Sequence, residues 1–343
     1  MPDKKLKFAI IGLDHNHCYN HVQLLVDAGA EFGRKYPDVP VASSREAILE
    51  DESITIIGGA AAPADRAGIS IQAMLHGKDV LADKPTVVNM GQLDEIERVR
   101  KETGRIWALY SNEHHDRRST VRAGELVAEG AIGRVVQTTG LGPHFFGDSK
   151  RPSWFFSPAT SGGVLGDLGS HQIEQFLCFT GSTEAEITLA QAGNFAHPEH
   201  PEFQDFGEAA LRGNGGVGWF RVDWYTPASL RVPGDIRLIV LGTDGYIEAR
   251  KYVDPAGRAG LPDPTGRPWS EHLLLVNGDG PRFIDLSDVK LKFGTRFLND
   301  VRDRTETAIP QARSFLAARL ATQAQAMACR LPADGPPLPQ GNA

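Results

Sequence analysis

The sequence predicts an α/β fold: a Rossmann-like, doubly wound parallel sheet followed by an α+β domain whose open sheet is mostly antiparallel. In the first third of the chain, short β-branched-rich runs alternate with helical segments, as in parallel sheets covered on both faces. Beyond residue 121, strand-like runs follow one another with hairpin-sized turns, which favours antiparallel pairing. We therefore expect two domains, over residues 1–117 and 118–331, and a disordered tail over 332–343.

Four short apolar runs predict the parallel strands of the first half, and segments with helical periodicity separate them. These helical segments carry suitable start and stop residues, such as a proline in the first turn or a glycine after the last. The predicted strands lie within 7–12, 53–59, 78–83 and 105–111. The predicted helices begin at a Ser43/Glu46 capping box, at Pro63 and at an Asn89/Gln92 capping pair, and the last two end at Gly77 and Gly104.

The second βα unit of this half is too short for its usual content. Residues 31–42, EFGRKYPDVPVA, carry one glycine and two prolines. A strand, a helix and their loops need roughly 20 residues. The segment has room for one strand at most, so we expect this unit to be truncated.

The second half is predicted to open with a helix over 120–133 and to continue mainly as strands. Hairpin-sized turns separate the strand-like runs, which is typical of an antiparallel sheet. These runs lie at 135–142, 215–226, 236–252 and 272–278, and a long helical segment at 309–331 ends the predicted fold.

Composition and charge exclude several classes of protein. The net charge of −7 comes from acids and bases spread along the chain, without the basic patch of a nucleic-acid-binding surface. No stretch approaches the roughly 18 apolar residues of a membrane span, and the basic start precedes too short an apolar run for a signal peptide. Cys18, Cys178 and Cys329 are odd in number and far apart, which predicts neither a disulfide framework nor a cysteine zinc site. We expect a cytoplasmic protein with no nucleic-acid or membrane partner.

The first strand runs into a turn that suits a nucleotide. Ligands of open parallel sheets bind beyond the carboxyl ends of the strands, and Gly12 follows the first of these ends. The helix start behind Gly12 offers free N–H groups to a phosphate. Asp14 opposes this interpretation, because a carboxylate repels a pyrophosphate unless it is turned away. Gly12 also fits a tight turn with no ligand at all.

The tripeptide Asp83-Lys84-Pro85 ends the third predicted strand. Proline stops the strand ladder and fixes the chain, so the Lys84 ammonium is expected at the mouth of the crevice. The alternative is a solvated surface lysine, which is the usual place for this residue type.

The segment SGGVLGDLGSHQIEQFLCFTG, residues 161–181, is the most informative motif. Its paired glycines permit close backbone approach, and Asp167 and His171 are four residues apart, so on one helix they would share a face. Facing a hydroxylated substrate, His171 could act as general base, with Asp167 orienting it or bonding a neighbouring hydroxyl. The alternative is a pair that caps and satisfies a buried helix start.

These motifs together resemble those of the Gfo/Idh/MocA oxidoreductases. The glycine turn, a DKP similar to that family's E-K-P, and GGVLGDLGSH, similar to its G-G-x-x-x-D-x-G-x-H, occur in the family's order. GELVAEGAIGRV resembles the lead into the family's second domain, and the resemblance covers residues 7–331. It implies a Rossmann domain that binds NAD or NADP and hydride transfer on a sugar, cyclitol or related polyol. It also implies substrate binding and homodimer or homotetramer contacts through the second-domain sheet.

The resemblance implies catalytic roles for Lys84, Asp167 and His171. Lys84 would stabilise the developing negative charge on the reacting oxygen, His171 would take the proton, and Asp167 would fix the sugar. Two places are possible for the aromatic residues Trp154, Phe155 and Phe156: the wall of a substrate pocket or the hydrophobic core. The predicted cofactor-binding residues are Gly12, Leu13, His15, Asn16, His17, Ala61, Ala62, Asp83, Lys84 and Pro85. The predicted substrate-binding residues are Lys84, His115, Trp154, Asp167 and His171.

Departures from the family pattern leave other hypotheses open. Asp14 and His17 stand where the second and third glycines are usual, and the short segment 31–42 lacks an assignable ribose-reading residue, so NAD and NADP are not distinguished. One alternative is a redox-neutral glycosidase or lyase that oxidises its sugar only transiently. Another is a non-catalytic sensor that has lost the cofactor. A third is a catalytic zinc or manganese site among His15, His17, His21, His114, His115 and Asp116.

Overall fold

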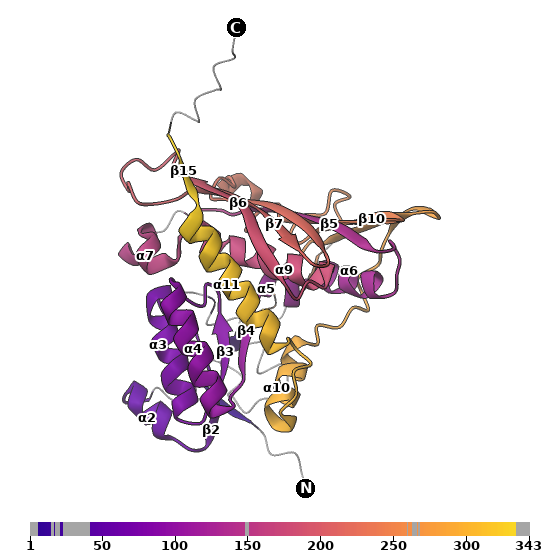
Figure 1. The fold of residues 1–343 in the computed structure, drawn as a ribbon. Helices are drawn as coiled ribbons and strands as arrows, with labels where there is room; N and C mark the ends of the chain where they lie inside the picture. The colour runs from indigo at the N-terminus through magenta and orange to yellow at the C-terminus, as the bar shows by residue number, and fades with distance from the viewer. Residues whose placement is uncertain are drawn as a thin grey trace.

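The structure, a computed structural model, describes residues 6–14, 17, 21–22, 42–147, 151–258, 260–262, 266 and 268–333. Its strands form a four-stranded parallel sheet, a nine-stranded mixed sheet and a two-stranded ribbon, β11 (Leu261–Pro262) with β12 (Pro268–Trp269). Figure 1 shows the smaller sheet and its helices below the larger sheet. The predicted fold class, a Rossmann-like parallel sheet followed by a mostly antiparallel sheet, is confirmed.

The smaller sheet has the order β1-β2-β3-β4, and all its neighbouring strands are parallel. Every residue of β3 and β4 is buried, which is why these strands have continuous apolar runs instead of an alternating pattern. The predicted truncation falls on residues 31–42, which lie outside the described residues except for Ala42. The strands are β1 (Lys7–Ile10), β2 (Ile54–Gly59), β3 (Asp79–Asp83) and β4 (Trp107–Tyr110), with helices α2 (Arg45–Glu50), α3 (Pro63–Leu75) and α4 (Met90–Thr103).

Helix ends follow the predicted residues in α3 and α4 and differ at the start of α2. Asn89 Oδ1 accepts from the Gln92 N–H at 2.9 Å, and Gly104 ends the same helix in the left-handed region, with φ 64°. The predicted Ser43/Glu46 box is wrong by one residue. Ser44 is the N-cap, because its extended backbone places Oγ 3.1 Å from the Ala47 N–H.

The larger sheet has the order β14-β13-β10-β9-β5-β8-β7-β6-β15. All its pairs are antiparallel except β5 with β8 and β6 with β15. The predicted final helix is wrong at its end, since Cys329–Leu331 leave it and pair with the free edge of β6 as strand β15. The other strands are β5 (Val135–Pro143), β6 (Ala185–Gly193), β7 (Phe206–Gly213), β8 (Gly216–Asp223), β9 (Arg237–Gly242), β10 (Gly245–Arg250), β13 (His272–Asn277) and β14 (Gly280–Phe283).

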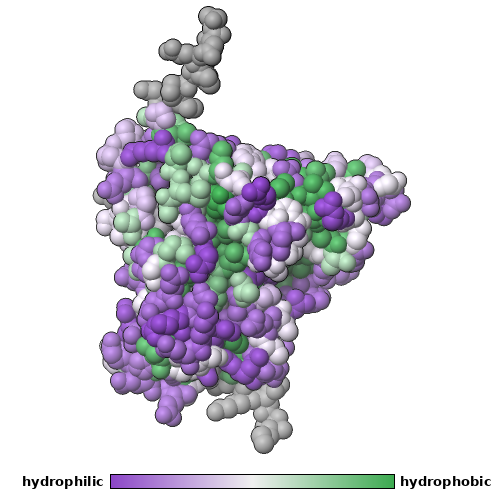
Figure 2. All heavy atoms as spheres, in the orientation of Figure 1, coloured by the Kyte–Doolittle hydropathy of each residue, from purple (hydrophilic) through white to green (hydrophobic). Residues whose placement is uncertain are grey.

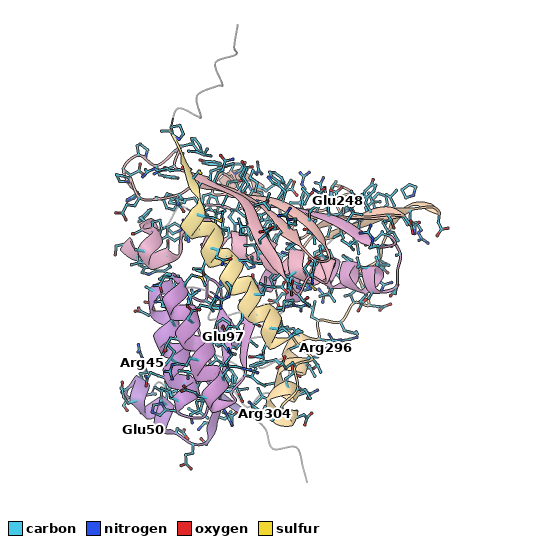
Figure 3. All side chains as sticks on the ribbon, in the orientation of Figure 1. Arg45, Glu50, Glu97, Glu248, Arg296 and Arg304 are labelled. Atoms are coloured by element: carbon cyan, nitrogen blue, oxygen red, sulfur yellow. The ribbon has the colours of Figure 1, made fainter. Side chains whose placement is uncertain are left out.

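Helices cover one face of the larger sheet, and the other face is free of helices in the described chain (Figure 1). Glu248 of β10, labelled in Figure 3, lies on that helix-free face. Figure 2 shows hydrophilic residues over much of the lower half of the molecule and apolar residues gathered nearer to the larger sheet. The helices of this half are α5 (Asn112–His115), α6 (Arg118–Ala128), α7 (Pro158–Ser161), α8 (Gly163–Asp167), α9 (Gly169–Thr180), α10 (Phe293–Asp303) and α11 (Gln311–Met327), with 3-10 turns at Ser153–Phe156 and Ala228–Leu230.

Helix α11 joins the two sheets. Its Gln311 and Ser314 accept hydrogen bonds from the N–H groups of Trp107 and Leu109 along β4, at 2.9 and 3.2 Å. Edge-strand donors that would otherwise face solvent or remain unpaired are thus satisfied. Farther along, its Gln325 accepts from an N–H of α8 at 3.1 Å, and an ion pair links it to Glu97 of α4, labelled in Figure 3. The site described below lies between the elements that α11 holds together.

No helix among the described residues combines the length and apolarity needed to cross a membrane.

Candidate active site

The turn after β1 lies directly against the loop after β2. Gly12 has φ 84°, and a Cβ on it would overlap the Ala61 side chain and approach Ala61 Cα to 2.7 Å. Any side chain at Gly12 would therefore separate the two loops. Leu13 next to it is 72% exposed, and Ala62 is the residue before α3, which begins at Pro63. His15 and Asn16, predicted cofactor residues, lie outside the described residues.

A buried arginine that sequence reasoning missed ties the loops after β2 and β3 together. Arg66 of α3 donates from Nε to the Ala61 carbonyl at 2.8 Å and from Nη1 to the Lys84 and Pro85 carbonyls, at 2.5 and 3.0 Å. Its Nη2 lies 3.0 Å from Asp83 Oδ2. The available sequence signal was an arginine on the apolar face of a predicted helix. Arg66 therefore holds the mouth of the crevice in one shape.

Asp83 turns inward from the end of β3. Its carboxylate lies 2.9 Å from His17 Nδ1 and 3.6 Å from His21 Nε2, besides the Arg66 contact. Burial alone would raise the pKa of Asp83, but His17 and Arg66 hold that pKa well below its usual value. The pKa of His17 is lowered by its own burial, against the opposing effect of Asp83. A ligand bound at this end of the sheet would therefore lie near a carboxylate whose negative charge is already balanced by Arg66.

Lys84 is buried at the end of β3, with 5% of its surface exposed, and its Nζ donates to Asp167 Oδ1 at 2.7 Å. Asp167 and His171 do not share one helix, contrary to the prediction. Helix α8 ends at Asp167, and α9 begins at Gly169. The glycine is needed there, because a Cβ would lie 3.0 Å from the ring of Phe220. Asp167 pairs with Lys84, whereas His171 pairs elsewhere.

His171 is a buried imidazole that stays unprotonated. Its Nδ1 lies 2.8 Å from Ser111 Oγ, at the end of β4, and its Nε2 lies 3.8 Å from Glu113 Oε1. Burial lowers the pKa of His171 to about 3; Glu113 opposes this shift and Lys84 adds to it. A neutral imidazole can accept a proton, as the general-base role requires.

Glu113, also missed from the sequence, lies at the centre of a buried polar cluster. Its Oε2 accepts from Lys251 Nζ and from Gln172 Nε2, each at 3.1 Å. Its Oε1 lies 3.3 Å from His144 Nε2. The pKa of Glu113 lies well below its usual value: burial would raise it, but its interactions with His171 and Lys251 prevail. No motif in the sequence marks these pairings, which join positions up to 138 residues apart.

The remaining predicted substrate residues lie in two places. His115 is buried, its ring stacks on Phe293 with centroids 3.9 Å apart, and its Nδ1 accepts from the Ser111 N–H. Trp154 is half-buried against Phe155. A small hollow adjoins Asp167, and aromatic side chains form much of its wall. It is lined by Phe155, Phe156, Pro158, Ser161, Gly163, Val164, Asp167, Phe203, Gln204 and Trp224.

The histidines proposed as metal ligands have other neighbours. Of those described, His17 and His21 face Asp83, and His115 faces Phe293. A separate group brings His114 Nδ1 to 2.7 Å from Glu174 and His114 Nε2 to 3.9 Å from the Cys178 sulfur. One ligand atom from each of these three residues lies within 4.8 Å of the others.

Comparisons with known proteins show which family the chain belongs to. The model of the GFO/IDH/MocA C-terminal domain matches residues 120–248. A crystal structure at 1.25 Å of a protein from Erwinia carotovora atroseptica SCRI1043, which carries an oxidoreductase assignment, is 44% identical with a TM-score of 0.89. That match covers 96% of this chain and 100% of the other. The chain belongs to the Gfo/Idh/MocA family.

Two curated relatives match shorter segments of this chain. D-xylose dehydrogenase of Paenarthrobacter nicotinovorans is 28% identical over 149 residues, which is 41% of this chain and 37% of that protein. The scyllo-inositol 2-dehydrogenase (NADP(+)) of Bacillus subtilis (strain 168) is 23% identical over 188 residues, or 55% of this chain and 51% of that protein. The chain thus spans about a third to a half of the length of these relatives.

Proposed function

We propose that this member of the Gfo/Idh/MocA family is an NAD(P)-dependent oxidoreductase that transfers a hydride between the nicotinamide and a CH–OH carbon of a sugar, cyclitol or related polyol. One observation carries the proposal. The Lys84 ammonium, fixed at 2.7 Å from Asp167, lies at the carboxyl end of β3 near His171, an imidazole that burial keeps neutral. A cation for a developing alkoxide and a base for its proton are the two groups that carbinol oxidation needs.

The described residues fit a dinucleotide at the mouth of the smaller sheet. Gly12 lies too close to Ala61 for any side chain, so the turn after β1 and the loop before α3 meet at this mouth, and Arg66 compensates the charge of Asp83. The glycine turn after the first strand is where dinucleotide-binding sheets receive a pyrophosphate. The named relatives act on a sugar and on an inositol, and one name includes NADP(+). The choice between NAD and NADP depends on the contacts of the adenosine end of the cofactor.

The chain's own residues divide the chemistry among them. When bound, the nicotinamide supplies or receives the hydride. Lys84 holds the carbinol oxygen and stabilises its negative charge, and His171 takes the hydroxyl proton. Asp167 keeps Lys84 in place and accepts a hydrogen bond from a neighbouring hydroxyl of the substrate. The aromatic hollow beside Asp167 offers flat apolar faces to the C–H face of a sugar ring.

We further propose that the helix-free face of the larger sheet joins copies of the chain into a homodimer or homotetramer. Apolar side chains are exposed there on several strands, which favours burial against a partner. The exposed residues include Leu189, Val217, Leu241 and Tyr246. The free thiols of Cys178 and Cys329 are consistent with a cytoplasmic location.

Calorimetric titration of the purified protein with NAD(H) and with NADP(H) tests the proposal first. We expect micromolar binding of one pair, followed by polyol-dependent formation of reduced cofactor. Stoichiometric reduced cofactor supports net oxidation, whereas product without reduced cofactor indicates the redox-neutral cycle. A folded protein that binds neither pair contradicts the proposal and favours the sensor hypothesis.

A further inference from the structure

The proposed function leaves one step unassigned, and the inference below rests on that function. Each oxidation delivers a proton to His171, and the next turnover requires its removal. His171 is only 2% exposed, so its ring has almost no direct contact with water. The proton must therefore leave through neighbouring groups.

The two oxygens of Glu113 differ in their surroundings. Oε2 is held by Lys251 Nζ and Gln172 Nε2, while Oε1 is buried and has no hydrogen-bond partner among the described residues. Oε1 lies 3.8 Å from His171 Nε2 and 3.3 Å from His144 Nε2. One side of the carboxylate is thus fixed, and the other faces two imidazole nitrogens.

His144 is positioned to accept a proton from this oxygen. Its Nδ1 lies 3.1 Å from the Gly142 carbonyl, which can only accept a hydrogen bond, so Nδ1 carries the hydrogen and Nε2 is the basic nitrogen. Its side chain is 17% exposed, compared with 2% for both Glu113 and His171. His144 is therefore the member of this group with the readiest access to water.

We propose that Glu113 and His144 form a proton relay that connects His171 to solvent. The Nε2–H bond of the imidazolium of His171 breaks, and the proton moves to Glu113 Oε1. It then passes to Nε2 of His144, which releases a proton to water and returns to its neutral form. For carbonyl reduction the same steps run in reverse, so no oxidant or other reactant is needed.

The surroundings of His171 and Glu113 make the protonated form of each group short-lived. The low pKa of His171, which burial lowers to about 3, makes its protonated form a strong acid. The pKa of Glu113 also lies well below its usual value, because its interactions with His171 and Lys251 outweigh its burial, so neither group retains the proton strongly. The charged, titratable or polar groups facing the relay are Ser111, Lys84 and His17 toward His171, and Lys251 and Gln172 toward Glu113.

Exchange of the ring N–H of His171 with water, measured by NMR on the full-length protein, tests the relay without substrate. His144→Phe keeps an aromatic ring beside Trp224 but removes the accepting nitrogen. Glu113→Gln combined with Lys251→Met removes the carboxylate without leaving a buried unpaired lysine. The matched control is His197→Phe, a half-buried histidine that stacks on Phe146 outside the relay.

We expect about tenfold slower exchange in both relay variants and wild-type exchange in the control. In turnover assays, His144→Phe should lower kcat with little change in KM. Wild-type exchange in folded His144→Phe overturns the relay, even where polyol oxidation is confirmed. Slower exchange in a protein without cofactor-dependent turnover supports the relay and rejects the proposed function.

Discussion

Two buried lysines of this protein each pair with a carboxylate, and they differ in what surrounds the pair. Lys84 donates to Asp167 at 2.7 Å, and the Asp167 side chain is 21% exposed. Lys251 donates to Glu113 at 3.1 Å, with 0% and 2% of the two side chains exposed. The same chemical pair therefore occurs once beside an open hollow and once in the interior. The pair with access to solvent, Lys84 and Asp167, can replace a mutual contact by a contact with a ligand. The pair without access to solvent, Lys251 and Glu113, stabilises the fold.

Energetics explain the difference. A fully buried ion pair repays its desolvation only through good geometry and further hydrogen bonds, and loss of one partner leaves an uncompensated charge. Lys251 and Glu113 meet this need with Gln172. Asp167 borders the aromatic hollow, where water or a substrate hydroxyl can replace a lost contact. Removing each lysine should therefore damage a different property.

The largest expected effect is on catalysis at Lys84. Lys84→Met should lower kcat by about 10³-fold, because it removes charge stabilisation used mainly in the transition state. Its unfolding midpoint in urea should stay near that of the wild type, because Asp167 remains solvated. Lys101→Met, an exposed lysine that pairs with Glu97 on α4, is the control and should leave kcat unchanged. Near-normal turnover of Lys84→Met would contradict the catalytic assignment.

Lys251→Met should show the opposite pattern. We expect the free energy of unfolding to fall by about 3–5 kcal/mol, because Glu113 would remain as a buried unpaired charge. Urea unfolding followed by circular dichroism measures this change. Adding Glu113→Gln to the same chain should recover much of the loss. Equal stabilities of the single and double variants would mean that the Lys251–Glu113 pair is not the source of the effect.

A smaller catalytic effect is expected at the carboxylate of the open pair. Asp167→Asn keeps the shape of the side chain but weakens its hold on the Lys84 ammonium. We expect kcat/KM for the polyol to fall by about 10²-fold through misplacement of the lysine, with cofactor affinity unchanged in calorimetry. An equal loss of cofactor affinity would place Asp167 at the nucleotide instead of at the substrate.

The remaining effect concerns the pH dependence of stability. Burial lowers the pKa of His171 from 6.5 to about 3, so the unfolded chain binds more protons than the folded one between these pH values. Stability from this residue is present above pH 6.5 and is lost as the pH falls toward 3, by up to about 1.4 kcal/mol per pH unit. His171→Gln should show a correspondingly flatter pH dependence in urea unfolding. Identical slopes for the two proteins would contradict a neutral buried His171.

The sequence alone predicted the parts of the site that local patterns reveal. A glycine turn after β1, a lysine before a proline at the end of β3, and the glycine-rich segment before α9 each follow from residue spacing, and all three lie at one end of the smaller sheet. Three details differed because competing local geometries decided them. Ser44 capped α2 in place of its neighbour, the backbone turned between Asp167 and His171, and Cys329–Leu331 joined a sheet edge.

By itself, then, the sequence determined the two kinds of sheet and the lysine, aspartate and histidine of the site, because strand periods and short motifs are properties of neighbouring residues. Only the tertiary structure decided which charges meet. Arg66 with Asp83 and Lys251 with Glu113 join residues 17 and 138 positions apart, and nothing in their local sequence specifies the partner. Burial then assigned their roles, because a charge removed from water must find its partner wherever the fold places it.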